Sequence, residues 1–170
     1  MNKTQWAAGL IFAALLLSAC RSVPLATSAA IPEGCSRATA LPAAPLRYSA
    51  ARAEAGGLAG AGTIRVERTL AQLSDWHELG GGWSLLNVAI EVRDANSLSL
   101  HLAGLKLPPR TELWFCSADR RSRQGPYRDA AGGELWTPVV PGGNALLEVV
   151  VPDAGRHDLA GQLRELYVGR

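Results

Sequence analysis

Apolar and polar side chains alternate with a period of two residues through much of the chain from Thr63 onward. This period is typical of strands that bury one face and expose the other. Residues 97–102 give the clearest case, with leucines on one face and polar side chains on the other: Leu98, Leu100 and Leu102 against Ser97, Ser99 and His101. We therefore expect a strand here with its leucines in the core.

Further strands are predicted over residues 64–67, 83–92, 111–117, 135–140, 145–151 and 162–168. Turn signals rich in Gly, Pro, Asp and Asn separate them. Strict alternation in the last strand sets one face against the other: Leu163, Glu165 and Tyr167 opposite Arg164, Leu166 and Val168. About seven or eight short strands without a long helix predict an all-β fold, an antiparallel β-sandwich or jelly roll over residues 63–170.

The preceding region, residues 20–62, has a different composition. It is rich in Ala, Pro, Gly and Ser and shows no sustained apolar period. Such a segment buries too little apolar surface to offset the entropy lost on ordering it. We therefore expect a disordered, flexible linker here, with at most a short helical turn over residues 50–55.

The N-terminus has the organisation of a signal peptide. Lys3 precedes an uncharged apolar run over residues 7–17, which is shorter than the roughly 20 residues that span a bilayer. The run ends in Leu-Ser-Ala-Cys at residues 17–20, which resembles the lipobox of bacterial lipoproteins. The resemblance implies that residues 1–19 are removed and that Cys20 carries lipid. An ordinary secretory signal with a chance cysteine, or an uncleaved anchor, are the alternatives.

A lipid-bearing Cys20 would place the chain in the cell envelope. One acyl chain anchors only marginally, whereas the two or three chains of a lipoprotein hold it on the membrane. Arg21 follows Cys20, where many inner-membrane lipoproteins of Gram-negative bacteria have Asp. The resemblance therefore implies an outer-membrane lipoprotein that faces the periplasm.

The two remaining cysteines, Cys35 and Cys116, predict a disulfide, because an exported chain enters an oxidising compartment. The alternative is two free thiols, with Cys116 buried in a strand and Cys35 in the mobile linker. No second cysteine or histidine lies at zinc-ligand spacing, so we expect no metal, and the sequence implies no cofactor.

The charge balance argues against a nucleic-acid partner. The formal net charge is +2, which gives little electrostatic attraction for a phosphate backbone. The densest basic group is Arg120, Arg121 and Arg123. We expect it to be a solvated loop.

Several segments resemble the β-domain that precedes the trypsin-like catalytic domain in secreted bacterial proteases of the lysyl-endopeptidase type. They span residues 107–115, 124–127, 133–142 and 145–152, and the more specific are Gly-Pro-Tyr at 125–127 and Trp-Thr-Pro at 136–138. The likeness extends roughly over residues 83–168. No Gly-Asp-Ser-Gly segment follows, so the resemblance implies a sandwich fold and an accessory role, not proteolysis.

The three histidines, His77, His101 and His157, give no catalytic pattern. A Ser-His-Asp site needs a histidine beside a carboxylate and an activated serine. Asp75 and His77 beside the glycine turn could line a loop site, although a polar loop around packed Trp76 is the simpler interpretation. We therefore expect a protein that is not an enzyme.

Three aromatic residues, Trp114, Tyr127 and Trp136, are candidates for a binding surface. Such rings provide large contact areas for sugars or peptides, but they could equally fill the core of the sandwich. The leading hypothesis is a membrane-anchored, noncatalytic binding module with a protein partner, such as a secreted protease. The alternatives are a carbohydrate- or cell-wall-binding lipoprotein and a small hydrolase.

Overall fold

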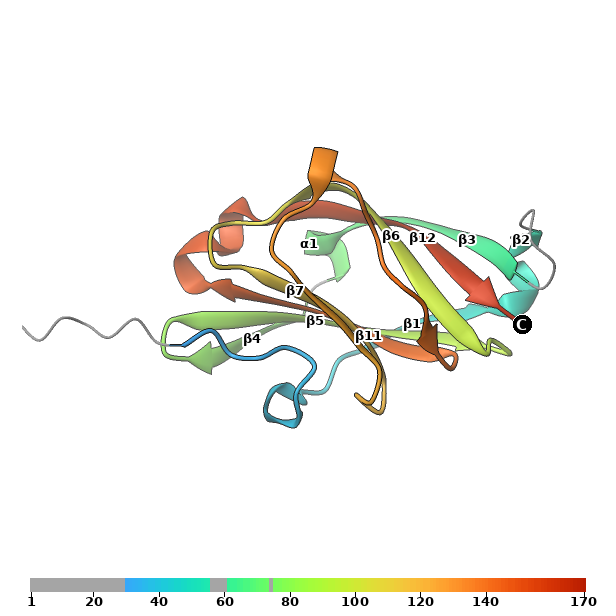
Figure 1. The fold of residues 1–170 in the computed structure, drawn as a ribbon, viewed down its shortest axis with the longest axis horizontal. Coiled ribbons are helices and arrows are strands. Elements are labelled where there is room, and N and C mark those ends of the chain that lie inside the picture. The colour runs from blue at the N-terminus through green and yellow to red at the C-terminus, as the bar shows by residue number, and fades with distance from the viewer. Residues whose placement is uncertain (1–29, 56–60, 74) are drawn as a thin grey trace, which may run out of the picture.

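Two six-stranded sheets pack face to face in the computed structural model, which describes residues 30–55, 61–73 and 75–170 (Figure 1). The predicted β-sandwich is confirmed. The expected signal peptide and Cys20 lie outside the described residues. Short helices connect the strands: η1 (Arg37–Thr39), η2 (Ala50–Arg52), α1 (Leu70–Leu73), η3 (Ala131–Gly133) and η4 (Asp153–Asp158).

The first sheet, sheet A, has the strand order β1-β5-β11-β7-β8, and β4 also pairs with β5. Its strands are β1 (Pro45–Ser49), β4 (Asp75–Gly80), β5 (Trp83–Arg93), β7 (Glu112–Ser117), β8 (Arg123–Tyr127) and β11 (Asn144–Pro152). Strand β1 runs parallel to β5, and the other pairs are antiparallel.

The second sheet, sheet B, has the order β10-β6-β12-β3-β2, and β9 also pairs with β6. Its strands are β2 (Glu54–Ala55), β3 (Ala61–Thr69), β6 (Ser97–Lys106), β9 (Leu135–Trp136), β10 (Val140–Pro141) and β12 (Ala160–Gly169). All of its pairs are antiparallel.

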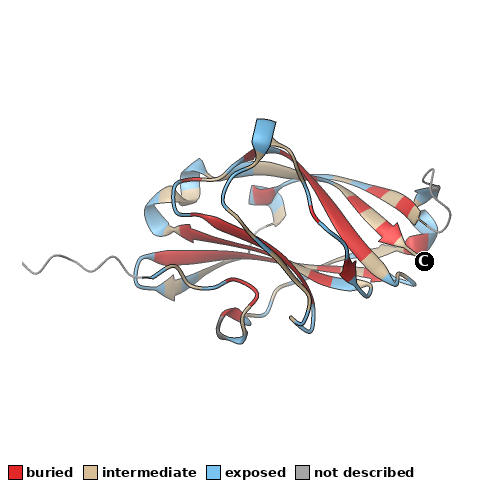
Figure 2. Ribbon diagram, in the orientation of Figure 1, coloured by how far each residue is buried: buried red, intermediate tan, exposed pale blue. Residues whose placement is uncertain are grey.

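The inner faces of the sheets form the main core, as the alternation predicts. The leucines predicted to face the core, Leu98, Leu100 and Leu102 of β6, are fully buried. They belong to one cluster with Leu86, Val88, Ile90 and Val92 of β5. Leu113 and Phe115 join the same cluster, whereas Trp114 and Cys116 face the other way. Figure 2 shows buried positions, in red, along the central strands of both layers.

Strand β12 departs from the strict alternation that the sequence predicts. Leu163 and Leu166 are both fully buried in the core, although they stand an odd number of residues apart. The register with β6 shifts between Leu163 and Glu165, so β12 has one extra residue, Arg164, at this point. A β-bulge of this kind moves the following side chains to the opposite face.

The strand predicted over residues 135–140 is two short pieces, β9 and β10, on the edge of sheet B. Pro138 lies between them, and Pro141 closes the second. Proline donates no backbone hydrogen bond, which confines it to edge strands and breaks in pairing. Strands β1, β2, β4 and β8 were not predicted from the sequence.

The expected linker over residues 20–62 is too long, because much of it packs on the sandwich. Residues 30–44, which we name the strap, cross the outer face of sheet A, and β1 then extends that sheet. Figure 1 shows the strap in blue beneath β5 and β11. Ile31 and Leu41 pack against Trp83 and Leu85.

The strap explains why sheet A is buried on both faces. All six residues of β7 are buried, although only one of its faces meets sheet B. Gly34 of the strap approaches Trp114 so closely that an added Cβ would lie 2.3 Å from Cδ1 of the ring. The side-chain amide of Asn87 on β5 donates to the Leu41 carbonyl at 2.7 Å. The strap is therefore a third layer of the fold.

Candidate functional site

Trp136 stands out on the surface of sheet B. Its side chain is 55% exposed, and Val139, on the same edge segment, is 59% exposed. They are the exposed large apolar side chains among the residues that the structure describes. Exposed apolar side chains on one ordered segment are candidates for an interaction surface.

The Trp136 ring is held in place in spite of its exposure. It stacks on His101 with ring centroids 4.2 Å apart and planes 11° from parallel, because β9 pairs Trp136 directly with His101 of β6. Hydrogen bonds also fix the position of the next residue, Thr137. The Thr137 amide donates to the Leu100 carbonyl, and the Leu100 amide donates to Thr137 Oγ1, each at 2.9 Å. The ring is thus presented by a rigid backbone.

His101, beneath the ring, lies between two carboxylates. Nε2 is 2.5 Å from Glu134 Oε2, and Nδ1 is 3.4 Å from Glu165 Oε2. Glu165 also accepts a hydrogen bond from the Tyr167 hydroxyl at 2.8 Å. The Tyr167 hydrogen bond, together with the smaller effect of His101, lowers the pKa of Glu165. Burial, reinforced by Glu165, raises the pKa of Tyr167.

Both nitrogens of His101 face carboxylates, and among the described residues neither nitrogen contacts a serine hydroxyl. The nearby Ser99 hydroxyl donates to the Thr137 carbonyl at 2.7 Å instead. The two carboxylates meet opposite sides of the imidazole and do not converge on one point. Within residues 30–55, 61–73 and 75–170, no three metal-ligating side chains form a candidate metal centre.

The three aromatic residues predicted as one surface lie in three different places. Trp114 is only 8% exposed, beneath the strap on the outer face of sheet A. Tyr127, on edge strand β8, packs against the main core. Trp136 alone is well exposed, on sheet B. Trp114 and Trp136 cannot share a platform because they belong to the outward faces of opposite sheets.

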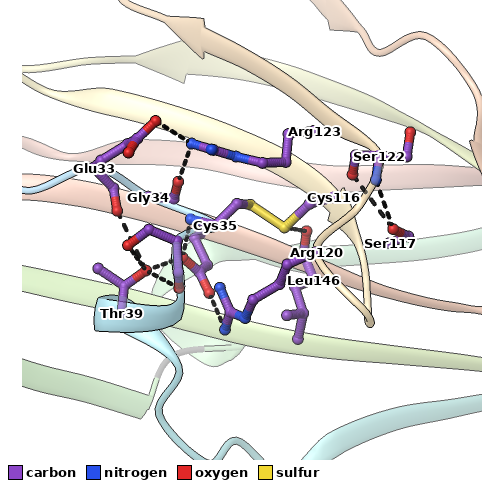
Figure 3. Close-up of a disulfide and its surroundings, with 12 residues drawn as sticks. Glu33, Gly34, Cys35, Thr39, Cys116, Ser117, Arg120, Ser122, Arg123 and Leu146 are labelled. Carbon is purple, nitrogen blue, oxygen red and sulfur yellow. Dashed lines mark hydrogen bonds and ion pairs between the residues drawn. A yellow bond between two sulfur atoms is a disulfide. The ribbon is translucent and has the colours of Figure 1, made fainter.

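The disulfide predicted between Cys35 and Cys116 is confirmed, with an S–S distance of 2.02 Å (Figure 3). It joins the strap to β7, and Trp114 and Leu146 pack beside it. Because disulfides persist in oxidising compartments, this bond indicates an extracytoplasmic domain.

A fully buried carboxylate, Glu148, lies next to the disulfide on β11. Its Oε2 accepts from the Cys35 amide at 2.6 Å and from the Thr39 hydroxyl at 3.2 Å. Its Oε1 lies 2.8 Å from the Arg120 guanidinium. Glu148 was not predicted to have a role, although a lone charge in the apolar strand 145–151 was a signal that it needed a buried partner.

The basic group at residues 120–123 is only partly the solvated loop that we expected. Arg121 has an 89% exposed side chain. Arg120 is 11% exposed and pairs with Glu148. Arg123 pairs with Glu33 at 2.5 Å, and its guanidinium lies 4.9 Å from the centre of the Trp114 ring. Arg123 therefore binds the strap through Glu33, and Arg120 balances the charge of the buried Glu148 carboxylate (Figure 3).

The histidines lie on separate elements, with His77 on β4, His101 on β6 and His157 in η4. Among the described residues, no helix is long and apolar enough to cross a bilayer.

Comparison with protein-family models and with curated proteins finds no match for this chain.

Proposed function

We propose that this chain is a membrane-anchored, noncatalytic lipoprotein of the cell envelope that binds a protein partner through the surface around Trp136. The observation that carries the proposal is a rigidly held tryptophan with more than half of its surface exposed. Tryptophan is enriched among the residues that dominate binding energy at protein interfaces. A ring that is already ordered loses little conformational entropy when a partner covers it.

The edge around Trp136 favours contact through side chains over strand addition. An exposed sheet edge can pair with an extended peptide, but Pro138 and Pro141 remove amide donors from this segment. Val139, three residues further along the same edge segment, is a second exposed apolar side chain. A partner would therefore cover Trp136 and Val139 with an apolar pocket of its own.

A protein partner fits these residues better than a sugar chain. The carbohydrate hypothesis relies on Trp114 and Trp136 on one face, and Trp114 is buried beneath the strap. A single stacking ring remains. The resemblance to the β-domain of lysyl-endopeptidase-type proteases supports a secreted protease as the partner.

We expect Trp136→Ala to abolish capture of the partner from detergent extracts of the envelope, because it removes the central apolar contact. Quantitative pull-down would show the bound partner reduced by at least about tenfold, equivalent to about 1.4 kcal/mol or more. Arg121→Ala, which removes an even more exposed side chain elsewhere, is the control and should bind normally. Equal capture by wild type and Trp136→Ala would refute the assignment, and elution by soluble cell-wall sugars would favour the carbohydrate alternative.

We also expect labelled fatty acid to be incorporated into the wild-type chain and not into Cys20→Ser. The thiol is the acceptor of the diacylglycerol group, and serine does not replace it. Cys35→Ser is not a suitable control because it breaks the disulfide, so an unrelated substitution such as Arg121→Ala serves instead. Unlabelled wild-type protein would show that the leader is of another kind.

A further inference from the structure

A basic groove lies at the edge of sheet A, away from Trp136. Its walls are Arg47, Tyr48, Arg52 and Arg93, and Glu91 and Asn144 line one end. Two adjoining hollows of about 250 and 240 Å³ share Arg47, Tyr48 and Arg93. Figure 1 shows β1, which carries two of these residues, leading to the end of the sandwich where the C-terminus lies.

The parallel pairing of β1 and β5 aligns the arginines. Arg47 lies opposite Glu91, and Ser49 lies opposite Arg93. Because alternate residues of a strand share a face, Arg47 and Arg93 are on the same side of the sheet. Arg47 Nε is 2.9 Å from Glu91 Oε2.

Arg52 reaches the groove from η2, which follows β1 directly. This turn is fixed at both ends. The Ser49 hydroxyl accepts from the Ala51 amide at 3.3 Å, and the Arg170 guanidinium donates to the Ala50 and Ala53 carbonyls at 2.5 and 3.2 Å. The backbone that carries Arg52 is therefore tied to the C-terminus of the chain.

The groove has more positive than negative charge. Among the described residues, only Arg47 of these arginines forms an ion pair, while Arg52 and Arg93 face no carboxylate partner. Three guanidinium groups against the single Glu91 carboxylate leave an excess of two positive charges. Tyr48 contributes to the wall from the neighbouring position of β1, while its side chain packs against the main core.

We propose that this groove binds a phosphate monoester group. A phosphate monoester has a charge of about −1.5 to −2 at pH 7, which matches the excess charge of the groove. Guanidinium forks bind phosphate oxygens through paired, charge-assisted hydrogen bonds. Each hollow is about 250 Å³ or less, which is enough for a compact anionic group. That group could belong to a soluble phosphate compound or to a lipid headgroup.

The test is calorimetric titration of the full-length exported protein in non-ionic detergent. The probes are inorganic phosphate, dihexanoyl phosphatidic acid and dihexanoyl phosphatidylcholine, which lacks a monoester. We expect the first two to bind and the third to give no heat. Arg52→Gln/Arg93→Gln should weaken binding by about tenfold or more, because charge-assisted hydrogen bonds are lost. Arg121→Gln, a matched loss of one exposed charge outside the groove, should bind as wild type.

The outcomes separate the sources of the phosphate. Tighter binding of phosphatidic acid than of inorganic phosphate would identify a lipid headgroup, and equal binding would identify a soluble phosphate compound. No binding of either probe to wild type would overturn the proposal. Undiminished binding by the double variant with an unchanged melting temperature would overturn it as well. Neither result depends on Trp136.

Discussion

Replacing Cys35 and Cys116 by alanine is expected to lower the free energy of unfolding by about 4–5 kcal/mol. The two residues are 81 positions apart, and the chain-entropy model gives about this value for a loop of that length. Most of the effect comes from the greater freedom of the unfolded chain. The strap also loses its covalent link to β7, so Trp114 should become accessible.

Urea unfolding of wild type and the double variant, followed by tryptophan fluorescence, would measure this difference. Wild-type protein unfolded in the presence of a reductant is the control, because it lacks the bond but keeps both sulfur atoms. Adding reductant should leave the double variant unchanged. A loss below about 1 kcal/mol would contradict the prediction, because the bond would then restrict the unfolded chain far less than a loop of this length should.

The second large effect is expected at Glu148. We predict that Glu148→Ala destabilises the protein by about 3–5 kcal/mol, because it leaves a largely buried Arg120 without its counter-charge. The Cys35 amide and the Thr39 hydroxyl lose an acceptor as well. Each unsatisfied buried donor costs about 1–3 kcal/mol.

A double variant distinguishes the ion pair from simple loss of packing. Glu148→Leu/Arg120→Leu removes both charges and should be more stable than Glu148→Ala, because apolar replacements of a buried pair are often neutral. Some loss should remain because the strap donors are still unsatisfied. If the double variant were as unstable as Glu148→Ala, the cost would lie in the strap contacts and not in the uncompensated charge.

The sequence was sufficient to predict the central strands and their core faces. In β5, β6 and β7 the alternation is clear because the inner face of each strand packs against apolar side chains of the opposite sheet. The alternation failed as a guide in β12, where a bulge at Arg164 moves the following side chains to the opposite face. The composition of the strand gives no sign of this bulge. The alternation also missed β4 and β8, whose polar side chains and Gly125-Pro126 do not show a strand pattern.

The strap was missed for a different reason. Its order does not come from its own composition, because it depends on one disulfide, a buried ion pair and a few contacts with sheet A. The sequence evidence for the strap lies in the strands that it covers. Consecutive apolar residues at 149–151, and Trp114 and Cys116 opposite the core face of β7, are typical of strands covered on both faces.

The candidate site was half predicted. Trp136 was among the aromatic residues singled out, and His101 was expected on the outer face of its strand, where Trp136 in fact stacks on it. Which aromatic residue is exposed could not be predicted, because Trp114 is covered only by the strap. The two carboxylates on His101 come from Glu134 and Glu165, which lie far from it in sequence.

The Cys35–Cys116 bond also determines how the protein would respond to tension from its N-terminal side. Force applied ahead of the strap passes through the sulfur bridge into β7 and bypasses every residue between the two cysteines. Strands β1 to β6 lie inside this closed loop and cannot be drawn out. In a chain held at Cys20, pulling on the anchor would therefore extend only the short stretch before Cys35 and the part beyond Cys116.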